Sequence, residues 1–325
     1  MARSQRLAPP AMPRGVVLLS MLLILALLSA VAFHMVGRHG LLVAQARYSF
    51  TQDQALSYAI GAEALARQVL YQDFTQTGVD VDHLEETWAR PLTPFAVEDG
   101  MMEVQVRDLN SCFNLNSLLG AGTQQNHERL RTLLRNLRLP ETHADAWRDW
   151  IDADEEIHGF GAEDGDYLLL ENAYRTANRP AGHLSELRLL RDMNREVYDA
   201  VKPHLCVLPT ETLQINVNTA DAVVLSSLDS SINPQQMQNL VQGERTFASV
   251  SEATNANPEL RGATSVMSVT SEFFEVHVRA EVGESRVELA SVMKRDPNNG
   301  NITLISRDFG KDFRSLFVSD EEQEQ

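Results

Sequence analysis

The sequence predicts an α+β fold, in which a long N-terminal helix packs on a small antiparallel sheet and a large all-helical domain is inserted into the sheet region. Three observations lead to this prediction. Residues 16–36 are apolar, and no proline occurs between Arg14 and Arg90, so nothing breaks a helix that begins there. Alternation of apolar and polar residues, typical of strands, occurs at residues 102–109 and again from residue 274. The residues in between carry short helical patterns.

Residues 16–36 (VVLLSMLLILALLSAVAFHMV) are long enough to span a membrane. At about 1.5 Å of rise per residue, such a helix covers the roughly 30 Å of a hydrocarbon core. Arg3, Arg6 and Arg14 precede it without any acidic residue. The positive-inside rule therefore predicts a single-pass protein whose N-terminus is cytoplasmic and whose remaining residues are exported.

We expect this helix to continue to about residue 73, with a total length of roughly 85–90 Å. Its second half carries small residues at spacings of three and four, which indicates an apolar face that packs on a domain: Ala55, Ala59, Ala62 and Ala66. Gly37, Gly40 and Gly61 are weak points where the helix could bend. Residues 37–109 therefore form the exported helix and the first part of the sheet domain.

The inserted helical domain is assigned to residues 110–270, where prolines and glycines separate the helical patterns. We expect its helices at residues 126–137, 142–151, 184–190, 194–201 and 220–227, with no further strand signal in this block. The last strands, in residues 271–318, are expected at 274–282, 286–294 and 302–305, and Gly283-Glu284 provides a hairpin turn. The acidic tail at residues 319–325 is expected to be disordered.

The formal charge is −17, and it becomes −20 without residues 1–15. Such an acidic chain repels nucleic acid, which argues against a sequence-independent DNA-binding role. Cys112 and Cys206, the two cysteines, both lie in the exported part. Oxidising compartments permit disulfides, so we predict a Cys112–Cys206 bridge that pins the neck of the inserted domain; two unlinked buried thiols are the alternative.

The N-terminal segment resembles the class III leader peptides of type IV pilins and pseudopilins. Arg14-Gly15 stands directly before the apolar run, and no small-residue cleavage site follows the run. The resemblance implies that residues 1–15 are a leader, that a prepilin peptidase cuts between Gly15 and Val16, and that Val16 is N-methylated. Most such proteins carry glutamate at the fifth mature position, where this chain has Ser20. A simple signal anchor is the alternative.

The densest group of acidic residues lies at 149–166, where eight carboxylates occur without lysine or arginine. Calcium takes six to eight oxygen ligands, and a carboxylate-rich loop supplies them. Ile157 stands where an EF-hand requires glycine, so the loop is not an EF-hand. The spacing leaves a solvated acidic loop equally open. The candidate metal ligands are Asp152, Asp154, Glu156, Glu163, Asp164 and Asp166.

Eight local motifs together resemble the GspK-type (XcpX) minor pseudopilins of type II secretion systems. In chain order they are RGVVLLSMLL (14–23), DLNSCFNLNSL (108–118), DWIDADEE (149–156), GAEDGDY (161–167), YRTANRP (174–180), LSELRLLRDM (184–193), INVNTA (215–220) and TSEFFEVHVRAEV (270–282). Each motif alone is weak, but the ordered set covers nearly the whole mature chain. The absence of the fifth-position glutamate is also the usual state in this family.

The resemblance implies a non-enzymatic subunit at the tip of the pseudopilus, which initiates or caps the filament for export of folded proteins across the outer membrane. The implied partners are the I- and J-type minor pseudopilins, other pseudopilins and the prepilin peptidase, in an inner membrane setting. It also favours structural calcium in the helical domain. No catalytic residue is assigned, because no catalytic motif occurs. The alternatives are a minor pilin of a type IV pilus and a signal-anchored periplasmic enzyme that uses the acidic loop.

Overall fold

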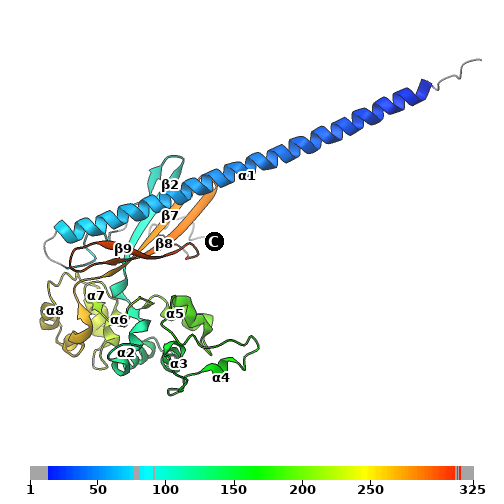
Figure 1. Cartoon of the computed structure of the whole chain (residues 1–325). Coiled ribbons are helices and arrows are strands. Elements are labelled where there is room, and N and C mark those ends of the chain that lie inside the picture. The colour runs from blue at the N-terminus through cyan, green and yellow to red at the C-terminus, as the bar shows by residue number, and fades with distance from the viewer. Residues whose placement is uncertain (1–13, 77–80, 91, 312, 314, 316–325) are drawn as a thin grey trace, which may run out of the picture.

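The computed structural model describes residues 14–76, 81–90, 92–311, 313 and 315. It confirms the predicted α+β class: a long helix lies across one face of a sheet, and a group of helices lies beyond the other face (Figure 1). The first thirteen residues of the expected leader and the whole acidic tail at 319–325 lie outside the described residues.

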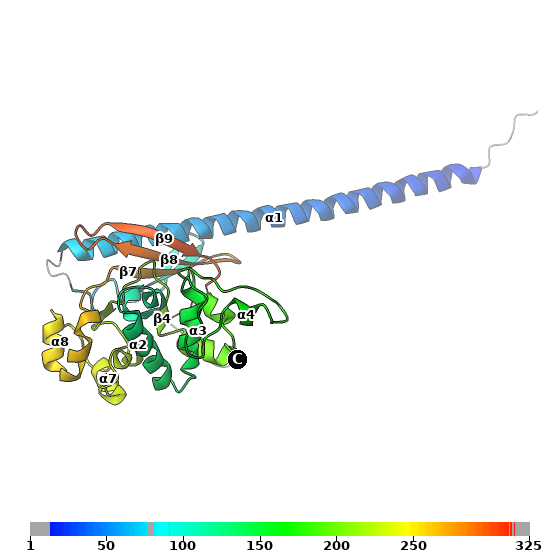
Figure 2. The same cartoon turned by 60° about the horizontal axis from the view of Figure 1, so that its bottom comes forward.

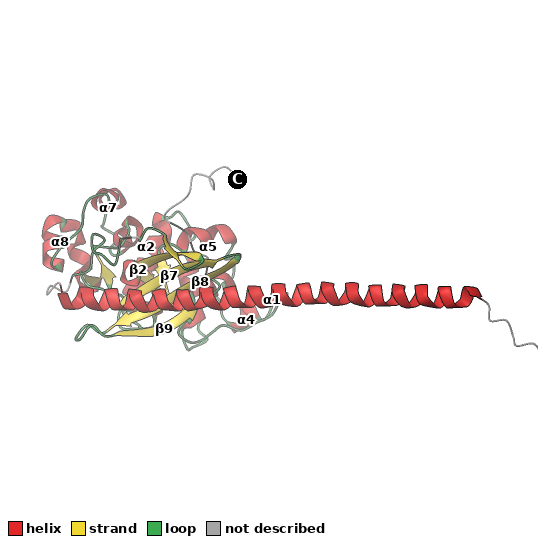
Figure 3. Ribbon diagram, turned by 90° about the horizontal axis from the view of Figure 1, so that it is seen from above, coloured by secondary structure: helices red, strands yellow, loops and turns green. Residues whose placement is uncertain are grey.

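Helix α1 (Arg14–Gln76) is one uninterrupted helix of 63 residues. It runs through Gly37, Gly40 and Gly61 without a break. The first half extends away from the rest of the protein (Figure 3). The second half packs on the sheet through small or apolar side chains that are at most 5% exposed: Ala55, Ala59, Ala62, Ala66 and Leu70. Because the alanines are small, the helix lies close to the strands.

The sheet has five antiparallel strands in the order β1-β2-β7-β8-β9. Their bounds are Phe95–Val97, Gly100–Asp108, Phe273–Val282, Ser285–Arg295 and Ile302–Asp308. β2 and β7 pair along their whole length, from Gly100↔Val282 to Asp108↔Phe274. One face of the sheet is buried under α1 (Figure 2), and it carries Val104, Val276, Val278, Ala280 and Leu289. The three-residue strand β1 is the only member of this sheet that the sequence did not predict.

All the short helices lie between β2 and β7 in the chain, although these two strands are neighbours in the sheet. The α-helices are α2 (Thr123–Asn136), α3 (Thr142–Ile151), α4 (Asp164–Tyr167), α5 (Arg195–Val201), α6 (Ala222–Ser227), α7 (Pro234–Val241) and α8 (Val250–Ala256). Four 3₁₀ helices accompany them, at Leu109–Ser111, Leu115–Leu118, Leu184–Leu189 and Pro258–Val266. They share one hydrophobic core, separate from the core under α1, whose largest fully buried side chains are Trp147, Tyr167 and Phe113.

The expectation of no strand in this block was wrong at two places. β3 (Phe113–Asn114) pairs in parallel with β4 (Leu205–Cys206), and β5 (Ile215–Asn216) pairs in parallel with β6 (Met267–Ser268). Such two-residue strands leave no periodic signal in the sequence. They lie at the neck, where the helical domain leaves and rejoins the sheet.

The predicted disulfide between Cys112 and Cys206 is present, so the alternative of two unlinked thiols is excluded. The bridge is buried in a small apolar cluster with Leu109, Leu208 and Phe273. Phe273 begins β7, and Leu109 directly follows β2. The disulfide therefore joins the helical domain to itself at the point where it meets the sheet.

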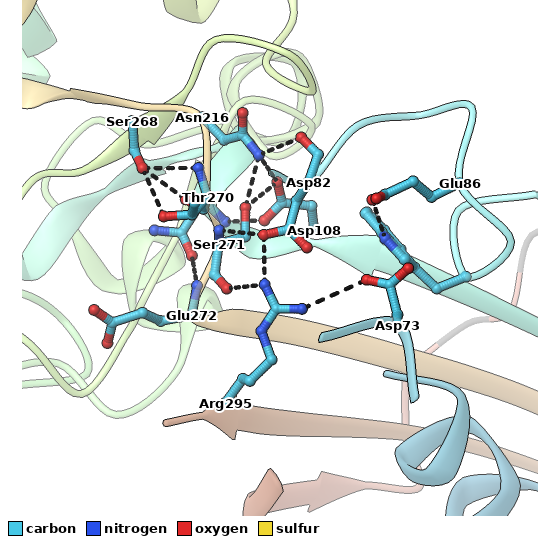
Figure 4. A network of polar contacts seen from close by, with 12 residues as sticks. Asp73, Asp82, Glu86, Asp108, Asn216, Ser268, Thr270, Ser271, Glu272 and Arg295 are labelled. Atoms are coloured by element: carbon cyan, nitrogen blue, oxygen red, sulfur yellow. Dashed lines mark hydrogen bonds and ion pairs between the residues drawn. The ribbon is translucent and has the colours of Figure 1, made fainter. Parts of the chain in front are cut away.

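A buried polar network at the same neck is centred on Arg295, at the end of β8 (Figure 4). The Arg295 side chain is 3% exposed and forms ion pairs with Asp82 and with Asp73, the latter at 3.7 Å. Asp82 also accepts a hydrogen bond from Ser271 N at 2.7 Å. Asp108, at the end of β2, accepts one from Ser271 Oγ at 2.6 Å. The network therefore links α1, the loop after α1, β2, β8 and the entry to β7.

The network holds more negative than positive charge. Three carboxyl groups, Asp73, Asp82 and Asp108, surround the single guanidinium of Arg295. Burial raises the pKa of Asp82 to about 7 and that of Asp73 to about 6, with Arg295 acting in the opposite direction. Burial also raises the pKa of Asp108. The folded protein therefore retains protons here that the unfolded chain releases, so this group favours folding more strongly as the pH falls from 7 toward 5.

Replacing Arg295 with methionine (Arg295→Met) should lower the free energy of unfolding by about 3–5 kcal/mol at pH 8, because buried carboxylates lose their counter-charge. The loss should shrink at pH 5.5, where those carboxyls are protonated. Chemical denaturation of the purified protein at both pH values measures it. Arg286→Met is the matched control, since Arg286 lies on the same strand, half exposed, and pairs with Glu281 and Glu288. Equal losses in the two variants would show that the neck does not depend on Arg295.

Candidate functional site

The acidic segment forms a loop between α3 and α4, and two buried aspartates of α3 set its path. Asp149 is fully buried and accepts hydrogen bonds from His158 N at 3.2 Å. Its Oδ1 also lies 3.0 Å from His158 Nδ1. Asp145, one turn earlier, accepts a hydrogen bond from Phe160 N at 3.0 Å. Residues four apart lie on one helix face, so the two carboxylates together hold the loop against α3.

Two glycines make this close approach possible. A Cβ atom at position 161 would lie 1.8 Å from Asp149 Oδ2, and one at position 159 would lie 2.6 Å from Asp145 Oδ2. Gly159 also has a φ of +58°, a conformation that residues with side chains rarely adopt. The sequence His-Gly-Phe-Gly at 158–161 therefore belongs to the loop's architecture. Sequence reasoning missed this role, although the Gly-x-Gly spacing within an acidic loop was visible.

The loop brings several carboxylates close together with oxygens that lack partners. Asp149, Asp152 and His158 each offer a ligand atom, and these atoms lie within 4.8 Å of one another. Asp152 Oδ1 and Glu163 Oε1 are buried and accept no hydrogen bond from the described residues. Glu163 is itself only 4% exposed. Buried oxygens of this kind are costly unless a proton or a cation satisfies them.

The pKa values of the cluster also indicate that its carboxylates need a proton or a cation. Burial, together with the charges of Asp149 and Asp152, raises the pKa of Glu163 to about 7. Burial, together with the charges of Asp154 and Asp149, raises the pKa of Asp152 to about 6. Crowded carboxylates with oxygen donors and no lysine or arginine among them fit a hard divalent cation such as calcium. Of the predicted ligands, Asp152 and Glu163 are therefore brought together, and Asp149 joins them although it was not named as a ligand.

Asp154 and Glu156 lie at the rim of this cluster. Asp154 Oδ1 accepts a hydrogen bond from Glu156 N at 2.8 Å, which forms a tight local turn. The charge of Asp154 contributes to the raised pKa values of both Asp152 and Glu163. Glu156 is exposed to solvent. Asp154 is thus near enough to act on the buried oxygens electrostatically, whereas nothing in the described contacts joins Glu156 to them.

Asp164 and Asp166 have partners of their own. Asp164 accepts hydrogen bonds from Thr176 N at 3.0 Å and Thr176 Oγ1 at 2.8 Å, and these contacts lower its pKa. It also pairs with Arg175 at 2.5 Å. Asp166 pairs with Arg191 Nη1 at 2.9 Å. Both residues therefore hold the loop to the segments that follow it.

The second candidate feature is the exposed first half of α1, residues 16–50, which we call the bare half of α1. Residues 16–50 are exposed along their length, including the large apolar side chains between Val16 and Phe50. Among the described residues, α1 is the helix long and apolar enough to cross a membrane. Ser20 donates a hydrogen bond to Val16 O at 2.5 Å and so satisfies its hydroxyl within the helix. This half contains no carboxylate between Val16 and Gln52.

Comparisons with known proteins agree on one family. Two family models, both described as "Type II secretion system (T2SS), protein K", match residues 111–210 and 215–271. Type II secretion system protein K of Pseudomonas aeruginosa is 35% identical over 91% of this chain and 93% of that protein. Its counterpart in Aeromonas hydrophila is 34% identical over 89% of this chain and 95% of that protein.

The fold has a solved counterpart as well. A chain in the crystal structure of the GspK-GspI-GspJ complex from enterotoxigenic Escherichia coli matches with a TM-score of 0.73 and 27% identity. The match covers 82% of this chain and 100% of that chain. Together with the fold, these findings define the chain as a minor pseudopilin. The chain belongs to the protein K family of type II secretion systems, which confirms the resemblance seen in its motifs.

Proposed function

We propose that this minor pseudopilin stands at the tip of the pseudopilus, where it initiates or caps the filament that drives export of folded proteins. The observation that carries the proposal is the position of the helical domain. It is inserted between β2 and β7 and lies on the far side of the sheet from α1 (Figures 1 and 2). A domain of this bulk leaves no room for a further subunit wound tightly above it. The helical domain can be accommodated at the end of the filament, where no further subunit is added above it.

Ser20 supports the same position. In most pilin-like subunits the fifth mature residue is a glutamate, and its charge inside the membrane needs a neighbouring subunit as partner. Here the Ser20 hydroxyl bonds to its own helix. The bare half of α1 therefore enters the membrane and the filament without a charge that requires a subunit ahead of it.

The implied partners are the I- and J-type minor pseudopilins, with other pseudopilins below them. Support comes from the solved relative, which was crystallised as a GspK-GspI-GspJ complex. The proposed membrane is the inner membrane, with the N-terminus cytoplasmic and the folded domains periplasmic; the arginines before residue 16 support this orientation. The prepilin peptidase is the proposed processing enzyme, acting between Gly15 and Val16, with N-methylation of Val16. The names of the relatives favour this structural role over an enzyme that uses the acidic loop.

We further propose that the acidic loop holds structural calcium. Asp149, Asp152 and Glu163 are the residues best arranged to hold the ion, and Asp154 lies beside them. A divalent cation there would neutralise carboxylates that otherwise repel one another across the loop. Glu156, Asp164 and Asp166, which the sequence also predicts as ligands, stay predictions, with Asp164 and Asp166 assigned to a second ion.

Processing tests the membrane part of the proposal. We expect the N-terminus of the membrane-purified protein to be Val16, methylated, when the prepilin peptidase is present, and residues 1–15 to be retained when it is absent. Intact mass and N-terminal sequencing measure both states. Cleavage at another bond, or retention of the leader in both strains, would leave a plain signal anchor.

The tip position predicts a fixed copy number. In sheared pseudopili of different lengths, the number of copies of this chain per filament should stay constant while the major subunit increases with length. Quantitative mass spectrometry of length-sorted filaments measures the ratio. A copy number that grows with length would place the chain along the filament instead.

The calcium proposal predicts opposite effects of one substitution under two conditions. In a chelator at pH 8, Glu163→Gln should raise the melting temperature by about 2–4 °C, because it removes a buried like charge worth about 1 kcal/mol. In millimolar calcium the same variant should melt below the wild type, because it loses a ligand. Differential scanning calorimetry of the purified protein measures both.

The matched control is Glu171→Gln, since Glu171 is exposed and follows the same loop. It should melt as the wild type does under both conditions. If chelation leaves the melting temperature of the wild type unchanged, the structural ion is ruled out. Because calcium requires ionised carboxylates, its affinity should also fall as the pH drops from 7 to 5.5, through the raised pKa values of Glu163 and Asp152.

A further inference from the structure

A cavity of about 760 Å³ lies between the helical domain and the face of the sheet that points away from α1. Gln105 of β2 and His277 of β7, which are paired in the sheet, form part of its floor. The opposite wall comes from the segments on either side of α5, which lies on the far side of the sheet from α1 (Figure 1). Its apolar lining includes Leu84, Val106, Leu205, Leu208, Val292 and Ile305. Ligand pockets in proteins have volumes of roughly 300–1,000 Å³ and mainly apolar walls, so this space is large enough for several side chains.

The C-terminal part of the chain runs along the rim of this cavity. Lys311 lines the cavity and forms an ion pair with Glu275 of β7. Phe313 is buried; its backbone N donates a hydrogen bond to Glu288 at 3.0 Å, and its backbone O accepts one from Arg279 at 2.8 Å. Along β7 the partners of this segment alternate with residues that face α1. The contacts therefore fix the chain after β9 on the same face of the sheet as the cavity.

Ser315, the last residue that the structure describes, lies at the edge of the cavity. Its Oγ donates a hydrogen bond to Glu103 Oε1 at 2.8 Å. Gln105 Nε2 donates a hydrogen bond to the same oxygen at 3.0 Å, and Gln105 lines the cavity. One carboxylate oxygen thus joins Ser315 to the cavity wall, and the chain continues to residue 316 from this point.

The next three residues, 316–318, are Leu-Phe-Val and lie outside the described residues. The acidic tail at 319–325 follows them directly. An extended chain covers about 3.3–3.6 Å per residue, so three residues reach about 10 Å from Ser315. Three large apolar side chains in a row gain from burial, whereas the charged residues that follow favour water. The sequence after Ser315 therefore combines a short apolar segment with a soluble end.

Two basic side chains at the cavity suit the acidic tail as a neighbour. Arg107 donates a hydrogen bond to Pro203 O at 2.7 Å, and Lys202 lies over the ring of Tyr198, 5.9 Å from its centroid. Neither forms an ion pair within the described part of the chain. The acidic lining residues that reach solvent already have basic partners, in the pairs Asp199–Arg195 and Asp221–His204. Carboxylates that follow residue 318 would supply the missing opposite charge.

We propose that residues 316–318 insert into this cavity and hold the helical domain against the sheet, while residues 319–325 stay in solvent beside Arg107 and Lys202. A segment tethered at Ser315 has an effective concentration at the cavity in about the millimolar range. This tether favours the segment over a second copy of the chain or a separate partner. The C-terminus thereby connects the two domains by side-chain contacts, and the proposal rests neither on the tip position nor on calcium.

The first test replaces Phe317 with the photo-crosslinking analogue p-benzoylphenylalanine. The full chain is held in phosphatidylcholine nanodiscs, because detergent could itself fill an apolar cavity. Illumination should give an adduct within one chain, which mass spectrometry should map to the segments that carry lining residues, 84–89, 105–109 or 202–209. The same analogue in place of Gln323 is the matched control and should give no such adduct.

Three outcomes of the crosslinking test would overturn the proposal. These are an adduct elsewhere in the chain, an adduct between two copies, and the absence of any adduct from position 317. The same experiment in cells should give the same adduct within one chain. Crosslinking of position 317 to a different protein instead would show that a partner, rather than the cavity, holds this segment.

Loss of the apolar side chains should loosen the two domains. The triple variant Leu316→Ser, Phe317→Ser, Val318→Ser should lower the melting temperature by at least about 4 °C, because it leaves the apolar walls of the cavity uncovered. The variant Gln323→Ser, Gln325→Ser changes only the tail and should melt as the wild type does. Differential scanning calorimetry in nanodiscs measures both. An unchanged melting temperature in the triple variant would contradict the proposal.

A double-mutant cycle tests whether the segment and the cavity act together. Leu84 lines the cavity and Leu92 does not, although the two leucines are 49% and 45% exposed and both lie between α1 and β1. Leu84→Lys places a charge at the cavity and should remove most of the loss that the triple variant causes, whereas Leu92→Lys should leave that loss intact. Equal losses in the two backgrounds would mean that residues 316–318 act elsewhere, and the proposal would fail.

Discussion

The two halves of this protein are held together by the buried charge of Arg295. The helical domain leaves the sheet after β2 and returns before β7, yet β2 and β7 pair along their whole length. The two connections between the sheet and the helical domain must therefore lie side by side. Arg295 fixes them through Asp82, which binds Ser271 N, while Asp108 binds the Ser271 hydroxyl. The disulfide and the two-residue strands lie around the same point. Without Arg295, the buried carboxyls of Asp82 and Asp108 would lack a counter-charge.

A second buried ion pair sets how α1 sits on the sheet. The alanines of α1 form a smooth stripe, and such a stripe alone does not specify register. Glu63, only 1% exposed, accepts two hydrogen bonds from Arg307 of β9, at 2.7 and 2.9 Å, and one from Ser291 of β8 at 2.7 Å. The Arg307 guanidinium lowers the pKa of Glu63. This oriented contact therefore fixes the position of α1 along the sheet.

The sequence predicted the elements with strong periodicity and missed those that tertiary contacts create. The apolar run at 16–36 and the alternation at 274–282 specify α1 and β7, and α3 has the expected bounds. The strands β3 to β6 are too short to leave a pattern. At the acidic loop, composition identified the cluster, but which carboxylates converge depends on Asp149 binding His158 across a turn that Gly161 permits. Spacing could not show that Asp164 and Asp166 pair with arginines from later segments.

The neck and the acidic loop solve the same physical problem in different ways. Each gathers several carboxylates, and in each, burial raises pKa values toward neutrality. At the neck the chain supplies a cation of its own, the guanidinium of Arg295, which pairs with Asp82 and Asp73. At the loop, Asp152 Oδ1 and Glu163 Oε1 are buried and have no hydrogen-bond partner among the described residues. The proposed calcium ion would satisfy these oxygens, and so would protons at lower pH. The stability of both regions therefore depends on pH, because burial raises the pKa of Asp82 and of Asp73 at the neck as well.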